Sequence, residues 1–306
     1  MLVDCDNTMG LARHEIDDGL TLLMLLGSDA VDVVGVTTVF GNGPEDSVYS
    51  HTRELLIDAG RPDIPVVRGA SRAGDYGTAA VSFIARVARE HRGRLAVLAI
   101  GPLTNLAGAL GIDPDFGKNI NRAYIMGGYL RRLRLLRREV AELNLSSDPV
   151  SAATVLFSGI AITLMSAQIC LQARYGLRHL LSDVIGRRRL GHLILEWFVF
   201  FSRHCGTVGF YLWDLVPGWA ILDSSRFRHR RVRIVSTADD LARGTLRTQE
   251  VSPGLDCEAG VIDLPGRIYR RFGIAGDCAR LWRQVPLRGY SRRGYSRYPH
   301  RKERPQ

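Results

Sequence analysis

The sequence predicts an α/β fold, an open and mostly parallel sheet flanked by helices, with a more helical C-terminal half. Two observations favour it. Strand-like and helix-like segments alternate through the first half of the chain. Its strand candidates are nearly continuous apolar runs, such as VDVVGVTTV at 31–39, which is typical of strands buried on both faces. With 306 residues, 46% hydrophobic and 24% charged, the chain can bury a sizeable core.

Each expected element is bounded by its own signals. Asp17 and Asp18 open the first helix, which Gly27 and Ser28 end, while Gly101-Pro102 and Gly127-Gly128 end later strands. In order, we expect a strand at 1–3, helix 20–27, strand 31–39, helix 45–59, strand 64–67, helix 79–91, strand 94–100, helix 105–110, strand 122–126, helix 149–157 and strand 160–165. From about residue 177 we expect more helix, with an apolar helix at 190–203 and a strand pair within 231–262 around residues 242–244.

Charge and cysteine content limit the class of protein. The net charge is +10 with only two lysines, and many arginines cluster at 131–138 and in the last residues. We expect one domain at 1–285 and a basic, disordered tail at 286–306, rich in Arg, Tyr, Ser and Gly. Such clusters are more often solvated than bound to nucleic acid. The five cysteines form no CxxC pair, and no apolar run could span a bilayer, so we expect a cytoplasmic protein.

An acidic stretch near the N-terminus is the strongest candidate site. Asp4 and Asp6 follow the first strand, and Asp17 and Asp18 open the first helix. Ligands of open α/β sheets bind at the carboxyl ends of the strands. Carboxylates brought together there repel one another, and a hard cation with oxygen ligands would relieve the repulsion. The alternative from these residues alone is a capped helix after a polar turn.

Several segments together resemble the nucleoside hydrolases, the inosine-uridine preferring N-ribohydrolases. They occur in the family's order: VDCD with IDDG, TTVFGN, AIGPLTNLA, IMGG, AELNLSSDP, WDLVP and LARGTLRT. One acidic doublet would be weak evidence, whereas seven ordered segments spread over residues 2–264 are specific. The resemblance implies the fold of that family and calcium-dependent hydrolysis of the N-glycosidic bond of ribonucleosides. It also implies a homo-oligomer, a dimer or tetramer, with no membrane partner.

The resemblance implies roles for individual residues. Calcium would be held by the carboxylates of Asp6, Asp18 and Asp214 and by the backbone carbonyl of Thr104. Asp6 would also be the general base that activates the attacking water, and Asp4 would support the ligands. The residues expected to bind substrate are Asp17, Asn42, Met126, Glu142, Asn144 and Trp213.

The chain departs from the family pattern at three places. Asp17 lies eleven residues after Asp6, further than is usual, so residues 7–16 must loop out and return. Leu136 stands where an Asn often contacts ribose. Trp213 stands where many members carry a His that protonates the leaving base. Trp213 could stack on a purine or be a core aromatic, and His14 is either a surface residue or a leaving-group acid.

Two other functions are compatible with parts of the sequence. VDCDNT also matches the start of haloacid-dehalogenase-like phosphatases, with Asp4 as nucleophile and Asp6 as acid/base, but Lys118 is the sole lysine before the tail and follows no strand. The chain could instead bind ribose or nucleosides with weak or no turnover. Residues 131–138 are either an exposed face or a lid over the pocket. Cys5 is expected to be a small buried filler.

Overall fold

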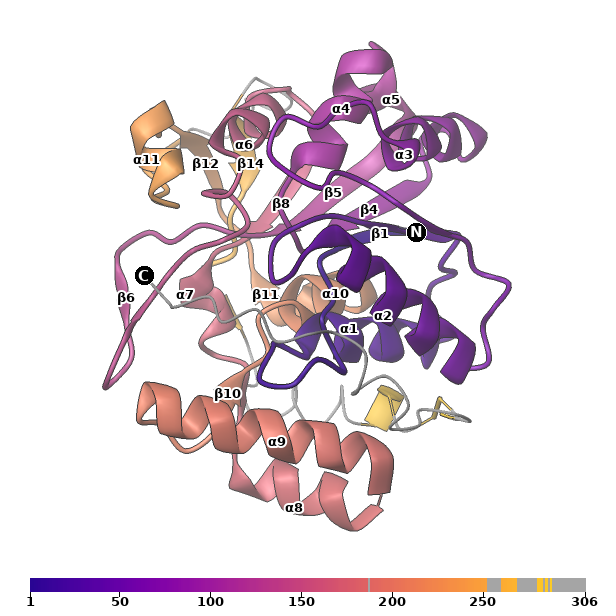
Figure 1. Ribbon diagram of the computed structural model, residues 1–306. Helices are drawn as coiled ribbons and strands as arrows, with labels where there is room; N and C mark the ends of the chain where they lie inside the picture. The colour runs from indigo at the N-terminus through magenta and orange to yellow at the C-terminus, as the bar shows by residue number, and fades with distance from the viewer. Residues whose placement is uncertain (187, 252–259, 269–279, 283, 286, 288–306) are drawn as a thin grey trace.

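Figure 1 shows the computed structural model, which describes the chain except residues 187, 252–259, 269–279, 283, 286 and 288–306. Within the described residues the main sheet has nine strands, in the order β13-β12-β14-β8-β5-β4-β1-β2-β3. Neighbours from β3 to β14 pair in parallel, and β12 pairs antiparallel with β14 and β13. The predicted open, mostly parallel sheet is therefore confirmed. The tail at 286–306 lies outside the described residues apart from Leu287.

The strands of this sheet are short. Their bounds are β1 (Leu2–Cys5), β2 (Gly35–Thr38), β3 (Val66–Val67), β4 (Leu95–Ala99), β5 (Ile120–Met126), β8 (Ile162–Met165), β12 (Arg231–Ile234), β13 (Thr248–Glu250) and β14 (Val261–Asp263). Three small two-stranded antiparallel sheets lie outside it: the hairpin of β6 (Leu133–Arg134) and β7 (Glu139–Val140), β9 (Arg174–Tyr175) with β10 (Phe210–Tyr211), and β11 (Phe227–Arg228) with β15 (Arg267–Ile268).

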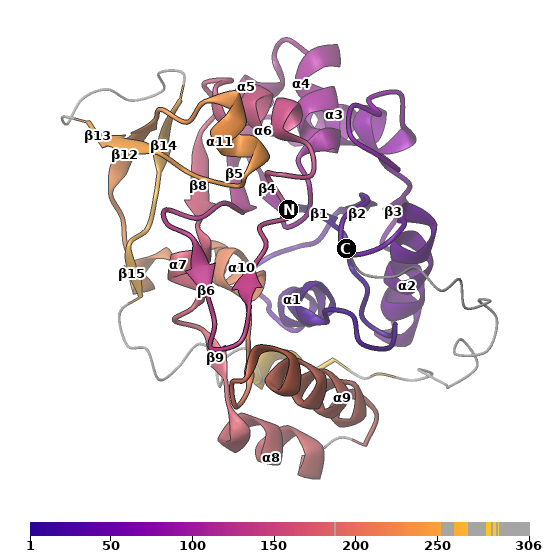
Figure 2. The same cartoon turned by 60° about the vertical axis from the view of Figure 1, so that its left-hand side comes forward.

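Helices cover both faces of the sheet (Figures 1 and 2). One face carries α3 (Ala79–Glu90), α4 (Thr104–Ile112), α5 (Phe116–Asn119), α6 (Pro149–Leu156) and α11 (Ala238–Ala242). The other carries α1 (Asp17–Leu26), α2 (Glu45–Asp58), α7 (Ala167–Cys170), α8 (Leu177–Gly186), α9 (Arg188–Cys205) and α10 (Leu215–Leu222), which the short 3₁₀ turn η1 (Ser224–Arg226) follows. None of the described helices is long and apolar enough to cross a membrane.

The central position of β1 in the sheet explains why all of its residues but Asp4 are apolar. Leu2 packs in the core beneath α3 and α4, whereas Val3 and Cys5 pack in the core that holds α1 and α10. Both faces of the strand are therefore buried, as the continuous apolar run predicts. Strand order reverses between β1 and β4, and in such sheets this switch point opens a crevice at the carboxyl ends.

The observed elements differ from the expected ones mainly in length. Strand β2 covers only 35–38 of the expected 31–39, because its ladder partner β1 begins at Leu2, which pairs with Gly35. Asp17 and Asp18 do open α1, as expected. The expected strand pair is β12 with β13, and the segment between them also forms the short helix α11. The second half contains the long helix α9, yet it also adds three strands to the sheet.

Candidate active site

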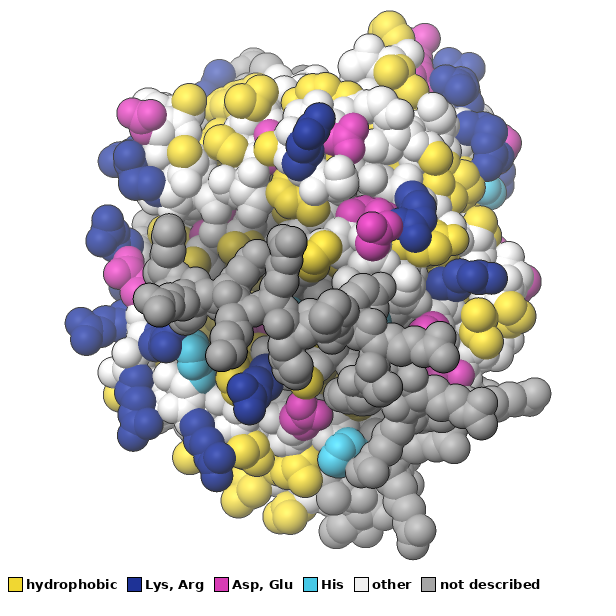
Figure 3. All heavy atoms as spheres, in the orientation of Figure 1, with side chains coloured by type: hydrophobic (Ala, Val, Ile, Leu, Met, Phe, Trp, Pro, Cys, Tyr) yellow, Lys and Arg dark blue, Asp and Glu magenta, His cyan; other side chains and the backbone are white. Residues whose placement is uncertain are grey.

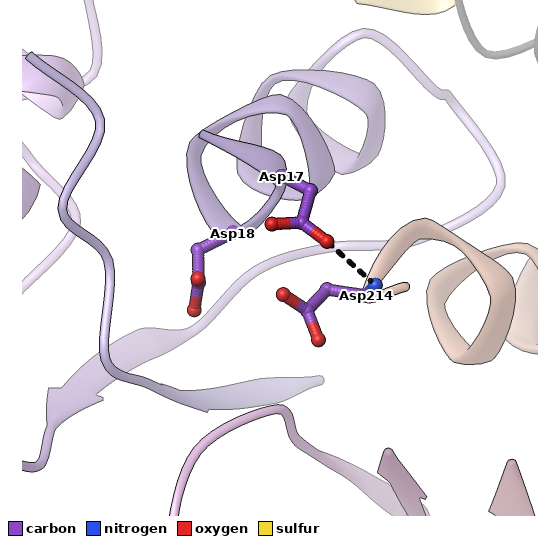
Figure 4. A group of neighbouring side chains, drawn as sticks. All are labelled: Asp17, Asp18 and Asp214. Carbon is purple, nitrogen blue, oxygen red and sulfur yellow. Dashed lines mark hydrogen bonds between the residues drawn. The ribbon is translucent and has the colours of Figure 1, made fainter. Parts of the chain in front are cut away.

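Four aspartates from three distant parts of the chain meet at the carboxyl ends of the central strands. Asp6 follows β1, Asp17 and Asp18 form the first turn of α1, and Asp214 precedes α10. All four are buried. Asp17, Asp18 and Asp214 each offer a carboxylate oxygen within 4.8 Å of the others (Figure 4). The Asp214 backbone N–H also donates to Asp17 Oδ2 at 3.3 Å, which joins the ends of α1 and α10.

Asp6 lies directly beside this group. Its backbone N–H donates to Asp18 Oδ1 at 3.2 Å, and its carboxylate accepts from the Asn42 backbone N–H at 2.7 Å. Gly41 makes that approach possible, because a Cβ at this position would lie 2.1 Å from Asp6 Oδ2. The group of three carboxylates within 4.8 Å thus includes Asp17, to which the resemblance gave a ribose contact, and Asp6 contacts Asp18 beside it.

The long connection between Asp6 and Asp17 loops out and returns, as its length required. Met9 is fully buried and packs against Gly19 of α1, where a Cβ would lie 2.4 Å from the Met9 sulfur. The Thr8 hydroxyl donates to the Glu15 carbonyl oxygen at 3.0 Å and closes the loop across its base. The loop tip then carries Arg13, His14 and Glu15 to the edge of a pocket.

Burial and mutual repulsion make these carboxylates reluctant to ionise. Loss of water raises the pKa of Asp6 to about 7, although the Asn42 N–H partly opposes this. Burial raises the pKa of Asp17 to about 6. Burial and the neighbouring carboxylates raise the pKa values of Asp18 and Asp214 well above the ordinary value. Such grouped shifts are typical of functional sites.

The donor set fits a hard divalent cation. Asp6 Oδ1 and Asp17 Oδ1 are buried and have no hydrogen-bond partner in the described part of the chain. Leaving buried polar atoms unpaired is costly, and leaving several buried charges unpaired costs more. Carboxylate oxygens are the ligands that calcium and magnesium prefer. A cation would therefore satisfy both the unpaired oxygens and the repulsion.

A pocket of about 290 Å³ opens beside the aspartates. Two tryptophans line it, Trp213 ahead of Asp214 and Trp197 of α9. Its other lining residues are Arg13, His14, Glu15, Asn42, Ile100, Met126, Tyr129, Leu133, Val140, Ala141, Glu142, Leu143, Asn144, Ala167 and Asp214. No motif of the sequence assigns a role to Trp197 or Tyr129, and Glu15 is only an alternative to Asp17 in a different register of the acidic segment. Trp197 in particular sits in an apolar helical pattern that marks core residues equally well.

Of the expected ribose contacts, Asn42, Glu142 and Asn144 line this pocket, whereas Asp17 lies behind it in the aspartate group and is not a lining residue. Glu142 and Asn144 are already hydrogen-bonded. The Glu142 carboxylate accepts from the backbone N–H groups of Gly128, Leu145 and Ser146 at 2.8–3.1 Å. The Asn144 Nδ2 donates to the carbonyl oxygens of Ile100 and Met126, each at 3.1 Å. These bonds fix both side chains.

Thr104 and Leu136, two other positions considered from the sequence, do not line the pocket. Thr104 is buried, and its hydroxyl donates to Asp148 at 2.7 Å. Leu136 is 79% exposed at the tip of the β6–β7 hairpin and faces solvent rather than the pocket.

That hairpin has two chemically different sides. Leu133 and Val140 line the pocket, whereas the arginines at 131, 132, 134, 137 and 138 are exposed. Figure 3 shows Lys and Arg side chains along the edge where Figure 1 places the hairpin. The Arg137 backbone N–H donates to the Cys205 carbonyl oxygen at 3.1 Å and ties the tip to the end of α9. The arginines are thus an exposed face, as favoured, on a hairpin whose apolar side walls the pocket.

Comparison with known proteins identifies the family of this protein. The family model described as inosine-uridine preferring nucleoside hydrolase matches residues 1–261. The chain belongs to the nucleoside hydrolase family. Enzymes of this family hydrolyse the N-glycosidic bond of ribonucleosides, so the predicted family and enzyme class are confirmed.

Individual relatives and structures agree with the family. Uridine nucleosidase 1 of Arabidopsis thaliana is 28% identical over 72% of this nucleoside hydrolase and 78% of its own length. A pyrimidine-specific ribonucleoside hydrolase of Klebsiella pneumoniae is 28% identical over 67% and 71%. Among solved structures, a plant nucleoside hydrolase has a TM-score of 0.78 at 21% identity, covering 93% of this chain and 98% of its own. A purine-preferring ribonucleoside hydrolase of Gardnerella vaginalis has a TM-score of 0.77 at 19% identity, covering 94% and 99%.

The surroundings of Asp4 and Lys118 argue against the phosphatase alternative. Asp4 accepts hydrogen bonds from the Thr37 hydroxyl at 2.6 Å and from Asn105 Nδ2 at 2.8 Å, within the buried sheet. Lys118 pairs with Asp115 at 2.7 Å on the surface of α5. Asp4 is therefore a buried support for the strand ends rather than an accessible nucleophile.

Proposed function

We propose that this nucleoside hydrolase cleaves ribonucleosides in a calcium-dependent reaction, with Asp6 as general base. The observation that carries the proposal is the group of buried carboxylates with unpaired oxygens at one end of a pocket lined by aromatic residues. Asp6, Asp18 and Asp214 would hold the ion together with the Thr104 carbonyl, and Asp17 is close enough to contribute. When bound, the ion would lower the pKa of a water molecule and position it.

The protein's own groups supply the remaining steps. Asp6 Oδ2 is fixed by the Asn42 N–H, while its unpaired Oδ1 can take the proton of the attacking water. The sugar develops positive charge at C1′ as the bond to the base breaks, and the surrounding carboxylates stabilise that charge. Asp17, Asn42, Glu142 and Asn144 would orient the ribose hydroxyls. Asn144 Oδ1 accepts no hydrogen bond among those of the described residues and can take one from a ribose hydroxyl, whereas both Glu142 oxygens already accept backbone N–H groups.

The two tryptophans supply aromatic surface to the pocket. Trp213 and Trp197 both line it, and Trp213 packs against Tyr211 with ring centroids 5.3 Å apart. Flat aromatic surfaces favour stacking with a nucleobase. We therefore assign base binding to the two tryptophans and Met126. Ribose binding is assigned to the part of the pocket next to the aspartates.

A reducing-sugar assay over a panel of purine and pyrimidine ribonucleosides tests the proposal. Ribose release should be measured with calcium present, after chelation, and after calcium is restored. We expect chelation to abolish release and calcium to restore it. Calcium binding without release of ribose from any nucleoside would instead identify a binding protein that has kept the fold and lost turnover.

A further inference from the structure

The tip of the inserted loop presents a histidine to the pocket. His14 lines the same pocket as Trp197, Trp213 and Met126, the residues to which we assign the base. In the described part of the chain it is the only histidine that lines this pocket. Its side chain is exposed, so the ring can exchange protons with solvent as well as with a bound ligand.

One nitrogen of the His14 ring is held by the backbone. Nδ1 lies 3.0 Å from the Ala12 carbonyl oxygen, and because a carbonyl oxygen only accepts, Nδ1 must carry the hydrogen. Nε2 has no partner among the hydrogen bonds of the described residues. Nε2 is therefore the nitrogen that is left to gain and lose a proton.

The backbone on both sides of His14 is fixed. Arg13 has a φ of 63° and is the only non-glycine residue with a positive φ in the part of the chain that the structure describes. Such a conformation persists only where the surrounding structure holds it, and it is found preferentially at functional sites. Here the Leu11 N–H donates to the Thr8 carbonyl oxygen at 2.9 Å, and the Thr8 hydroxyl donates to the Glu15 carbonyl oxygen at 3.0 Å.

The reaction needs a proton at the end of the pocket that receives the base. The N-glycosidic bond breaks with its electron pair on the base, and a general acid lowers the barrier by protonating that leaving group. Trp213 can donate a hydrogen bond but is no acid at neutral pH. Histidine, in contrast, gains and loses a proton near neutral pH.

We propose that His14 is the general acid that protonates the departing base through Nε2. This rests on the proposed function, because it completes the same reaction. As the bond from C1′ to the base breaks, its electron pair takes the Nε2 proton, and the imidazolium becomes a neutral imidazole that keeps its Nδ1–H on Ala12. The attacking water forms the new bond to C1′ and gives its proton to Asp6. Solvent then carries that proton from Asp6 back to His14, so neither group is consumed.

Other ionisable groups near His14 are less suited to this step. They are Arg13, Glu15, Tyr129, Glu142 and Asp214, which line the pocket, and His51 of α2, which interacts with His14 electrostatically. Arginine does not release its proton, both Glu142 oxygens accept backbone N–H groups, and Asp214 is assigned to the ion. Tyr129 and Glu15 remain as rivals, and the experiment includes both.

The dependence on the leaving group tests this role. His14→Gln keeps a polar side chain that cannot act as an acid, so kcat on inosine or uridine should fall by about 10²–10⁴-fold with KM little changed. A 4-nitrophenyl riboside releases a stable anion that needs no proton, and His14→Gln should cleave it as fast as the parent does. His91→Gln, at the end of α3 on the opposite face of the sheet, is the matched control and should leave both reactions unchanged.

The outcomes separate this inference from the proposed function. If His14→Gln slows both substrates equally or neither, or changes KM alone, the inference is overturned while the proposed function stands. The same follows if Tyr129→Phe or Glu15→Gln shows the selective loss on nucleosides and His14→Gln does not. A parent that cleaves the 4-nitrophenyl riboside but no nucleoside has no working acid, which also overturns the inference. If the parent cleaves neither substrate with calcium present, the proposed function fails and the inference fails with it.

Discussion

At the scale of single residues, the site is defined by buried carboxylates. Nothing in the described part of the protein neutralises their charges. Asp6 is the most constrained of them, since glycines at 41 and 101 leave room for its side chain and the Asn42 N–H fixes one oxygen. Fixing one oxygen while leaving the other unpaired is a suitable arrangement for a base. The distinction between its two oxygens cannot be derived from the sequence, because it depends on the turn after β2.

Replacing Asp6 tests its role as the base. Asp6→Asn keeps the shape but cannot take a proton, and general-base catalysis contributes about 10²–10⁴-fold. We expect kcat, measured as ribose release at saturating calcium, to fall by at least about 10²-fold. Asp29→Asn, at an exposed carboxylate between α1 and β2, is the control. Activity within threefold of the control would assign the base to another residue.

Calcium titration can separate the proposed role of Asp17 from that of Asp6. The resemblance gives Asp17 to the ribose, yet its oxygen lies within 4.8 Å of those of Asp18 and Asp214. If ribose binding is its main role, Asp17→Asn should lower kcat/KM while calcium affinity changes little. Asp6→Asn should weaken calcium binding strongly. The reverse pattern in a calorimetric titration would make Asp17 the ligand.

At the scale of elements, the inserted loop decides whether α1 can present its aspartates. Gly19→Ala would place a Cβ 2.4 Å from the Met9 sulfur and 2.7 Å from its Cβ, so the loop must shift. We expect a loss of about 1–3 kcal/mol in unfolding free energy and reduced ribose release. Gly111→Ala in α4 is the control, because nothing lies within 4 Å of its Cβ, and it should gain about 0.5–1 kcal/mol. Equal stability of the two variants in urea unfolding would contradict the packing role of Met9.

The elements themselves were largely predictable, while their contacts were not. Apolar runs and Gly or Pro breaks place β1, β4, β5 and most helices within a few residues, because local sequence determines them. The docking of Met9 on Gly19 and of Arg137 on the end of α9 joins segments with no shared pattern. The same holds for Trp197, whose position in an apolar helix does not indicate which side faces the pocket.

At the scale of the whole molecule, the strand order brings together residues from positions 6 to 214. Parallel pairing of β1 with β2 and β4 aligns their carboxyl ends, which explains why Asp6 and Asn42 meet. Asp214 reaches the same point through the packing of α10 beside α1. Spacing alone could not predict that last contact, and only the family's order of segments indicated it. This convergence concentrates negative charge at the centre of the fold.

That charge should make stability depend on pH and calcium together. The metal-free protein holds Asp6 with a pKa of about 7 and Asp17 of about 6, above their unfolded value near 3.8. The folded state therefore binds more protons than the unfolded state between pH 4 and 7, so its stability should fall as pH rises through that window. A calcium ion that binds only the folded state would replace those protons, so at pH 8 it should restore about 2.7 kcal/mol at a hundredfold excess over its dissociation constant.

Urea unfolding at pH 5 and pH 8, each with chelator and with calcium, measures this coupling. We expect the chelated protein to be less stable at pH 8 than at pH 5, and calcium to stabilise it far more at pH 8, because protons compete for the same oxygens at pH 5. Asp18→Asn removes one of the repelling charges, so its chelated form should show a flatter pH dependence than the parent. Equal stabilisation by calcium at both pH values would show that the ion does not bind at these aspartates. A parent and variant with the same slope in chelator would show that repulsion at Asp18 does not set the pH dependence.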